Sequence, residues 1–284
     1  MNISQQIVNG IFLGAGYAFV AIGWTILLGT AKLVNFAHGQ FYMLGAFIAW
    51  YFMAAMGMPY VAAGLVAVVL MALLGAVMQV MLRGLVYDQK LTSIMIVTLG
   101  VGYMLDGAAT LLFSGNPQNF VSPLRAMRIE FADVRFTMQD VAILVGALVF
   151  YALVWTVRNH TRVGTAIRAI AEDAKLAQAF GIRTGRLYIA TFAFEGASVA
   201  LAAVLIAPRT PILTNMGFEE VIMTFVVVVV GGIGSVGGAL LAGFGLGLFI
   251  AFFGALVSPA YAMAGAFGLL LILLAVKPEG LSRG

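Results

Sequence analysis

Nine long apolar runs decide what this chain can fold into. A helix that crosses the hydrocarbon core of a bilayer needs roughly 20 apolar residues, and most of the runs approach or exceed that length. A transmembrane barrel would instead alternate apolar and polar residues in segments of about 10, which these runs do not do. The sequence therefore predicts an all-α integral membrane protein with eight or nine transmembrane helices, some of them short or broken. The runs lie at about residues 7–30, 40–57, 60–82, 92–113, 140–158, 188–208, 219–233, 236–257 and 261–276.

The composition leaves little room for structure outside the membrane. Of the 284 residues, 63% are hydrophobic and 9% are charged, whereas a soluble domain carries about 25% charged residues. We therefore expect a single transmembrane domain over residues 1–284. The chain has no cysteine, which excludes disulfides and thiolate metal sites. The start of the chain lacks the basic residues of a cleavable signal peptide.

The basic residues predict the orientation of the chain. The segment at about 159–187 is strongly basic, whereas the charges in the segment at about 114–139 nearly balance. The positive-inside rule places the first segment in the cytoplasm. Counting helices outward from it gives an external loop at 114–139, an external N-terminus and a cytoplasmic C-terminus. The net charge of +4 therefore reflects topology rather than binding to nucleic acid.

Two local patterns predict contacts outside and inside the membrane. Residues 128–136 alternate polar and apolar side chains, the period of a half-buried strand, and predict a small external hairpin. Gly10 and Gly14, like Gly243 and Gly247, are spaced to lie on one helix face. Small residues at this spacing allow two helices to approach closely in a membrane.

A polar stretch interrupts the first two apolar runs. Asn35, His38 and Gln40 place amide and imidazole groups, with Phe36 among them, where the flanks offer apolar side chains. Polar groups at membrane depth are costly unless they are paired or face water. The stretch is therefore either a loop at the bilayer surface or the break in a discontinuous helix that lines a pathway.

A glycine-rich interruption at Gly231–Gly238 is the counterpart of the first near the other end of the chain. It follows the seventh apolar run, which is short for a full span. In transporters built from structural repeats, glycine-interrupted helices in corresponding halves point to the substrate path. We predict that the two interruptions line or gate a translocation path. The alternative is that both are tight cytoplasmic turns.

An acidic residue, Glu195, lies within the sixth apolar run. Because a charged side chain at a helix centre costs roughly 2.5–3.5 kcal/mol, Glu195 should face the bundle interior. It either lines the path or contacts a broken helix, or it bonds to a nearby threonine or backbone group and only fixes packing. Asp106, nearer the outer end of its run, is expected at the interface. The predicted path or gate residues are Asn35, Phe36, His38, Gln40, Glu195, Gly231, Gly232, Gly234 and Ser235.

The same residues do not support enzyme chemistry. Gly231–Gly238 is not followed by the Lys-Ser/Thr pair of a phosphate-binding loop. A membrane serine protease would need Ser235 paired with a histidine, and the only histidines are His38 and His160, of which the second lies in the basic segment. No catalytic or metal-binding residue is assigned.

The basic segment contains an amphipathic pattern over 163–181. Apolar residues recur there at helical spacing, and Gly181 is placed to end the helix. A short amphipathic helix outside the membrane lies on the lipid surface or docks into a groove of a partner. The alanine-rich face favours docking to protein.

Five motifs, in order along the chain, resemble the signatures of branched-chain amino-acid ABC transporter permeases of the Liv type. The resemblance is to the smaller of the two permease subunits. It covers the chain from residue 17 to residue 281, and the combination is specific. The motifs are Tyr17 to Gly23, Asn35 to Gly45, Arg168 to Ile182, Val230 to Ala239 and Pro278 to Leu281.

The resemblance implies partners that the composition does not show. Such a permease pairs with a second, homologous permease, two cytoplasmic ATPases and a periplasmic substrate-binding protein in the bacterial inner (plasma) membrane. ATP and Mg would be bound by the ATPases, and this chain would hold no cofactor. The amphipathic segment would be a coupling helix seated in an ATPase. Its residues would be Arg168, Ala171, Glu172, Asp173, Ala177 and Gly181.

The resemblance leaves the transported solute open. Branched-chain amino acids, urea, short amides and small organic acids are all carried by similar systems. The family's usual acidic residue after Ala-His-Gly is Gln40 in this chain, so no carboxylate is expected at that position. An alternative of another class is a stand-alone channel or ion-coupled carrier that uses Glu195 as its ion site. It would depend on an ion gradient rather than on ATP.

Overall fold

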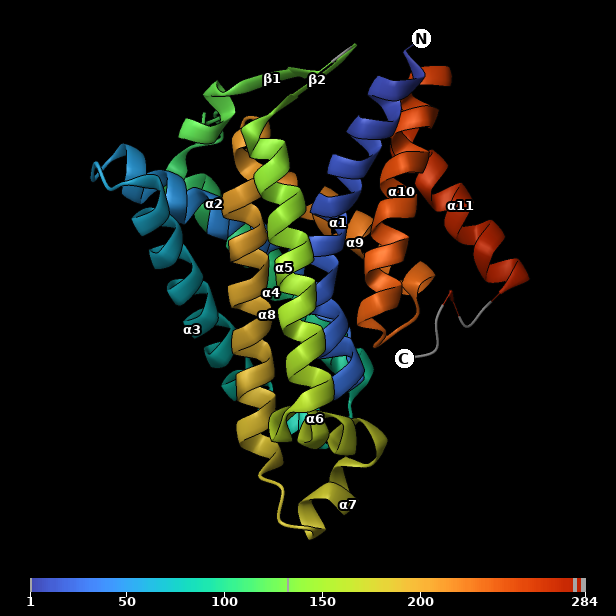
Figure 1. Ribbon diagram of the computed structural model, residues 1–284. Coiled ribbons are helices and arrows are strands. Elements are labelled where there is room, and N and C mark those ends of the chain that lie inside the picture. The colour runs from blue at the N-terminus through green and yellow to red at the C-terminus, as the bar shows by residue number, and fades with distance from the viewer. Residues whose placement is uncertain (1, 132, 278–279, 282–284) are drawn as a thin grey trace.

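The computed structural model describes residues 2–131, 133–277 and 280–281. Each of the nine predicted apolar runs forms a helix, which confirms the all-α membrane fold (Figure 1). The helices from these runs are α1 (Ile3–Ala31), α2 (His38–Ala54), α3 (Tyr60–Tyr87), α4 (Leu91–Phe113), α5 (Met138–His160), α8 (Thr184–Ile206), α9 (Met216–Gly231), α10 (Val236–Leu256) and α11 (Ala262–Val276).

Within the described residues, seven helices are long and apolar enough to cross a membrane, α11 being counted together with the turn Pro259–Tyr261 that leads into it, as the span Pro259–Val276. The other two of the nine, α2 with 17 residues and α9 with 16, extend about 24–26 Å at 1.5 Å per residue. That is shorter than a hydrocarbon core of about 30 Å. The predicted shortness of the seventh run is confirmed. The second run is also short, because α2 ends before Gly57, which has a φ of 66°, and Pro59.

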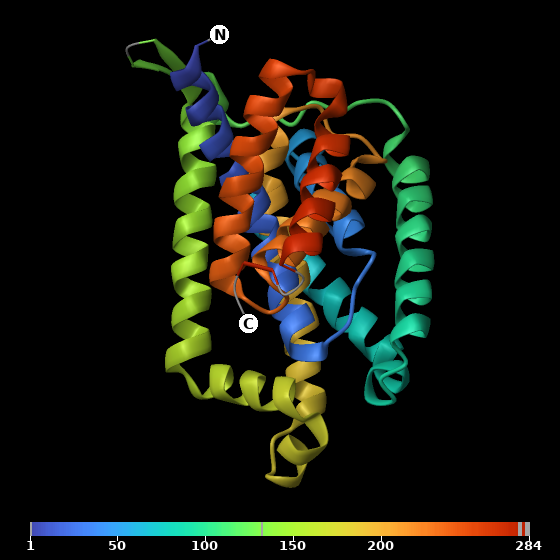
Figure 2. The same cartoon turned by 90° about the vertical axis from the view of Figure 1, so that its right-hand side faces the viewer.

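Helix α1 runs through the middle of the bundle and contacts α5, α8, α9 and α10 (Figures 1 and 2). Its closest neighbour is α10, and the predicted small-residue faces meet there. A Cβ atom added to Gly14 would lie 2.6 Å from Cα of Phe244, and one added to Gly10 would lie 2.8 Å from Cα of Leu248. The absence of a side chain at Gly10 and at Gly14 therefore sets the distance between α1 and α10.

The predicted hairpin is present as β1 (Arg128–Phe131) and β2 (Val134–Thr137), which are antiparallel and pair Ile129 with Phe136. It lies beside the start of α1, at one end of the bundle (Figure 1). The Gln5 side chain holds it there by two bonds to Arg135: Nε2 donates to the carbonyl at 2.9 Å, and Oε1 accepts from the N–H at 2.8 Å.

The amphipathic segment forms two helices at the opposite end of the bundle, α6 (Arg162–Glu172) and α7 (Ala174–Ala179) (Figures 1 and 2). The prediction of a single helix over 163–181 is therefore wrong. Asp173 is extended, with φ −149°, and its carboxylate caps α7 by accepting from the N–H groups of Lys175 and Leu176 at 2.8 and 3.0 Å. The predicted end at Gly181 is confirmed, because its φ of 84° cannot continue a helix.

Candidate functional site

The first interruption is an irregular, largely buried break between α1 and α2. Lys32 ends α1 with a φ of 53°, and α2 begins at His38. The Asn35 side chain folds back so that Oδ1 accepts from the N–H of Ala37 at 3.0 Å. The hydroxyl of Thr98 on α4 accepts from the N–H of Phe36 at 3.1 Å. Two N–H groups of the break are thus paired with side chains of the protein, as buried backbone groups require where water is absent.

Glu195 on α8 contacts the break directly. Asn35 Nδ2 donates to both carboxylate oxygens at 3.0 Å, and His38 Nδ1 lies 2.9 Å from Oε1. All three residues have 0% exposed surface. The prediction that Glu195 faces the interior is confirmed, and its partners come from the broken helix rather than from a threonine. Sequence reasoning selected all three residues but had no signal for their contact across about 160 positions.

An aromatic ring closes the other side of this cluster. The indole of Trp24 on α1 stacks on the imidazole of His38, with ring centroids 4.9 Å apart and planes at 9°. Trp24 Nε1 and His38 Nε2 are buried and have no hydrogen-bond partner within the described part of the chain. A buried polar atom without a partner costs free energy. The cluster therefore holds two polar atoms that are not paired with another group of the described protein.

Gln40, which stands where the family usually has a carboxylate, lies near a carboxylate on α4. Its Nε2 donates to Oδ2 of Asp106 at 3.4 Å, a long bond. Asp106 is partly buried, and its Oδ1 has no partner among the described residues. Asp106, which was expected at the interface, thus contacts the first turn of α2, and its interfacial position stays a prediction. An acidic group is present beside this turn although position 40 is an amide.

The second interruption is a tight turn between α9 and α10. Gly232 and Gly234 have φ values of 97° and 83°, which only glycine adopts without strain. Ser235 turns its hydroxyl inward and accepts from the N–H of Gly238 at 3.1 Å, capping α10. A Cβ atom on Gly231 would lie 2.6 Å from the carbonyl carbon of Gly238. The glycines are therefore required by the turn itself.

Two distant segments pack against this turn. Gly29, near the end of α1, would place a Cβ atom 2.9 Å from Cα of Gly234. The N–H of Leu281 donates to the carbonyl of Val230 at 2.8 Å, and Gly280 lies against Gly232. The last motif therefore packs against the second interruption in space. Its first residue, Pro278, lies outside the described residues.

An open cavity of about 440 Å³ lies at the hairpin end of the bundle, between α1, α2, α9 and the turn Ala207–Arg209 that follows α8. It carries charges of both signs within an apolar wall. Sequence reasoning missed it, because its charged residues lie outside both interruptions. The cavity is lined by Leu13, Gly16, Tyr17, Tyr42, Ile206, Arg209, Thr210, Met216, Glu219, Glu220 and Met223.

The guanidinium of Arg209 is held in this cavity by a carboxylate from α5. Its Nε lies 3.3 Å from Oδ1 of Asp140. Oδ2 of Asp140 in turn accepts from the N–H and the hydroxyl of Thr137 at 2.9 and 2.7 Å, which caps α5. One edge of the guanidinium is thereby fixed, and its remaining N–H groups are left for another acceptor.

Arginines connect the α6–α7 segment to the second interruption. Arg168 on α6 donates to the carbonyl of Arg158 at the end of α5. The Arg158 side chain donates to the carbonyl of Gly234. Ala177 is buried, whereas Glu172 and Asp173 are exposed. The pKa of Asp173 lies below its ordinary value, because the N–H groups of Leu176 and Lys175 donate to the carboxylate.

A bundle of apolar helices with two short helices, a buried polar break and a charged cavity is typical of a membrane transport protein. Residues 6–276 match the family described as "Branched-chain amino acid transport system / permease component". The chain belongs to this family, which confirms the resemblance seen in its motifs. It is a permease subunit, not an enzyme, and a multi-pass protein of the bacterial inner membrane.

Individual relatives agree over nearly the whole chain. The permease protein LivH of Escherichia coli, of a high-affinity branched-chain amino-acid transport system, is 33% identical and is matched over 98% of this chain and 94% of LivH. BraD of Pseudomonas aeruginosa is also 33% identical, over the same shares. A probable LivH of Methanocaldococcus jannaschii is 26% identical over 81% of this chain and 74% of its own. As the permease of an ABC transporter, this chain works with a partner ATPase and a binding protein.

Proposed function

We propose that this permease passes branched-chain amino acids, delivered by a periplasmic binding protein, through the cavity at its hairpin end. The observation that supports this is the cavity's lining. Arg209 offers N–H donors for a carboxylate, and Glu219 and Glu220 offer acceptors for an ammonium group. The apolar wall, which includes Met216 and Met223, suits an aliphatic side chain. A zwitterion with an apolar side chain requires these three features together.

The same lining argues against the other solutes. Urea and short amides carry no net charge, so they form no ion pair with the arginine or with the two carboxylates. A small organic acid would be repelled by Glu219 and Glu220. The ion-coupled carrier is also disfavoured, because both oxygens of Glu195 accept bonds from protein and its exposed surface is 0%.

For the first interruption we propose the role of a gate. Asn35, His38 and Glu195 are closed off in this conformation. Opening the bundle around α2 would separate Glu195 from Asn35 and would let water reach the unpartnered nitrogens of Trp24 and His38. The cluster would therefore favour the closed form through its carboxylate, while the two unpartnered nitrogens reduce the cost of opening.

For the opposite end we propose coupling to ATP hydrolysis. The α6–α7 segment lies in the cytoplasm in this arrangement, with the N-terminus and the hairpin outside. Its residues Arg168, Ala171, Glu172, Asp173, Ala177 and Gly181 form the docking region for one of two ATPases, which bind ATP and Mg. A second, homologous permease completes the pathway. Movement of α6 would reach the second interruption, Gly231, Gly232, Gly234 and Ser235, through the two arginine contacts.

Uptake into vesicles tests the proposed substrate. The complete transporter, with its ATPases and binding protein, is reconstituted with wild-type permease, Glu220→Gln or Arg209→Lys, and ATP-dependent uptake of leucine and urea is measured. A hydrogen bond to a charged group contributes about 1.5–3 kcal/mol, so Glu220→Gln should reduce leucine uptake about tenfold or more. The matched control is Glu130→Gln, which removes an exposed carboxylate from the hairpin, paired with Arg135 at 3.2 Å, and should leave uptake unchanged.

Two results would contradict the proposal. Leucine uptake that is unchanged in both variants would show that the cavity does not contact the solute. ATP-dependent uptake of urea in preference to leucine by the wild type would show that the solute is not a zwitterion. Thermal unfolding of each variant, measured in parallel, separates a loss of transport from a loss of fold.

A further inference from the structure

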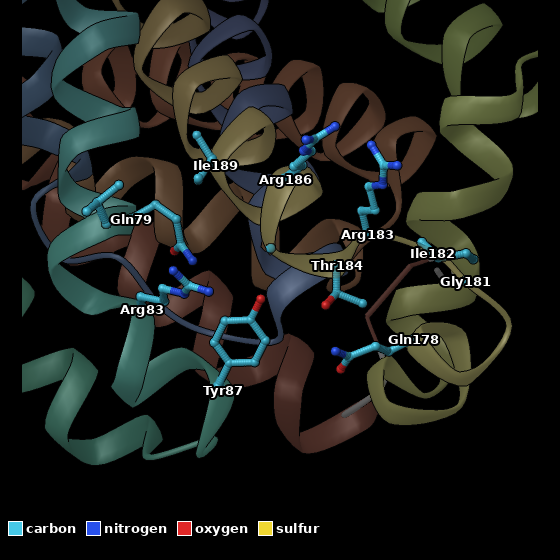
Figure 3. Close-up of a pocket in the computed structure, with 12 residues that line it drawn as sticks. Gln79, Arg83, Tyr87, Gln178, Gly181, Ile182, Arg183, Thr184, Arg186 and Ile189 are labelled. Carbon is cyan, nitrogen blue, oxygen red and sulfur yellow. The ribbon is translucent and has the colours of Figure 1, made fainter.

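A second cavity, at the end of the bundle near α6 and α7, is cationic. It has a volume of about 490 Å³ and lies between the end of α3, the start of α8 and the residues that follow α7. Figure 3 shows Arg83 on the α3 side and Arg183 and Arg186 at the start of α8. Three arginines thus line one cavity that the proposed translocation path does not use.

These arginines have no carboxylate partner. Within the described part of the chain, no acidic oxygen lies within 4.0 Å of their guanidinium nitrogens. The nearest acid along the chain, Asp88, pairs with Lys90 at 3.0 Å. Arg83 instead lies over the ring of Tyr87, 5.7 Å from its centroid. Arginine is suited to phosphate, because its planar group presents several N–H donors in a fixed geometry.

A buried amide gives the cavity a polar wall. Gln79 is 1% exposed, and its Oε1 has no hydrogen-bond partner among the described residues. It lines the cavity on the same side as Arg83 (Figure 3). A buried acceptor without a donor is costly, so a ligand that brings a hydroxyl or amine hydrogen would be favoured. Phosphate alone, fully ionised, brings none.

The start of α8 adds the positive end of a long helix. Its first turn is not capped by a side chain, and α8 is 23 residues long. The N–H groups of Thr184 and Arg186 bond to the carbonyls of Ile182 and Arg183, so it is the helix dipole at this end that favours anions. Thr184, which is 3% exposed, also lines the cavity.

The cavity has an apolar rim on the side of the membrane. Val80 and Ile189 line it and are 60% and 37% exposed. Val77, one turn earlier on α3, is 53% exposed, so the rim continues into the surface that faces lipid. A ligand that fills both parts must be amphipathic, with an anionic head and an apolar body.

We propose that this cavity binds the headgroup of an anionic phospholipid. The phosphate would contact the three arginines, a hydroxyl of the headgroup would donate to Gln79, and the acyl chains would lie along Val80. Basic pockets between helices on the cytoplasmic side are suited to such headgroups. Because Gln178 and Ile182 also line the cavity, the lipid would join α3 and α8 to the α7 end of the proposed coupling segment.

Native mass spectrometry of the purified transporter tests the proposal. The delipidated complex is titrated with phosphatidylglycerol or phosphatidylcholine, with wild-type permease, Arg186→Gln alone, or Arg83→Gln, Arg183→Gln and Arg186→Gln together. Each cation near a membrane surface contributes about fivefold in affinity. Phosphatidylglycerol should therefore bind about fivefold more weakly to the single variant and about 100-fold more weakly to the triple variant. The single variant keeps the test valid if the triple variant does not fold.

The control is a triple variant, Lys90→Gln, Arg162→Gln and Lys175→Gln, which has the same net charge as the triple arginine variant. The three positions lie outside the cavity, so this control should bind the lipid as the wild type does. Equal binding of both lipids, or of phosphatidylglycerol by all variants, would overturn the proposal. So would displacement of the lipid by excess inorganic phosphate, which would indicate a soluble anion. If the triple arginine variant lost the ATPase but bound the lipid unchanged, the cavity would be a contact for the ATPase, and the proposal would also be overturned.

Discussion

The hydrogen bonds between Asn35, His38 and Glu195 make a quantitative prediction. Replacing Glu195 by alanine would leave Asn35 Nδ2 and His38 Nδ1 without the acceptors that now lie at 3.0 and 2.9 Å. Each orphaned buried group costs about 1–3 kcal/mol. The free energy of unfolding should therefore fall by about 2–6 kcal/mol, because all three residues are inaccessible to water.

The value of the single pair follows from a double-mutant cycle. Pairs of polar residues in membranes average about 0.6 kcal/mol and reach about 1.7 kcal/mol, since unfolded helices in a bilayer also find partners. We expect the Asn35–Glu195 coupling at the upper end, about 1.5 kcal/mol, because the acceptor is a carboxylate and both of its oxygens are engaged. Wild type, Asn35→Ala, Glu195→Ala and the double variant are compared by reversible unfolding in bicelles.

A second double-mutant cycle, between Asn35 and Gln139, is the control for this experiment. Gln139 on α5 is buried and donates to the carbonyl of Leu205, so it shares no partner with Asn35. Its alanine variant should be additive with Asn35→Ala within about 0.3–0.5 kcal/mol. A coupling between Asn35 and Glu195 no larger than in this control would refute the reasoning, and the break would then be held by packing alone.

Three further predictions follow from local geometry. A Cβ atom on Gly39 would collide with the carbonyl oxygen of Gly217, so Gly39→Ala should lower the free energy of unfolding by about 1–3 kcal/mol. Gly100→Ala on α4, where nothing lies within 4 Å of the added Cβ atom, should raise it by about 0.5–1 kcal/mol. Equal effects of the two variants in thermal unfolding would be inconsistent with this packing. Glu172→Gln should weaken co-purification of the ATPase and uptake, whereas Glu130→Gln on the hairpin should retain both; normal uptake by Glu172→Gln would exclude a role in docking. Because the pKa of Asp173 is lowered, its cap stabilises α7 at neutral pH and is lost as the pH falls below the ordinary carboxyl value. The protection factors of the α7 amides in hydrogen exchange should therefore fall in acid in the wild type and not in Asp173→Ser, whose hydroxyl keeps the cap.

Much of the fold could be predicted, because a membrane restricts what an apolar run can do. Nine runs became nine helices, and the alternation at 128–136 became a hairpin. The spacing of Gly10 and Gly14 correctly indicated a close helix contact. These predictions succeed because each depends on residues that are near one another in the chain.

The contacts within the candidate site could be predicted only in part. Glu195 was expected to face the interior because of its cost in lipid, yet its bonds to Asn35 and His38 depend on how α8 packs against the break. The location of Arg209 depends on Asp140 in the same way. The division of the 163–181 helix was missed because Asp173 is compatible with a helix interior but prefers to cap.

The contact between Leu281 and Val230 has a consequence for biosynthesis. The carbonyl of Val230 belongs to the last turn of α9, where the helix leaves its final carbonyls without internal partners. Its donor is the N–H of Leu281, which follows α10 and α11 in the chain. The α9–α10 turn therefore gains this bond only after both later helices have been synthesised. A nascent chain arrested before residue 281 should lack the bond, and limited proteolysis should cut the turn faster in that chain than in the longer one.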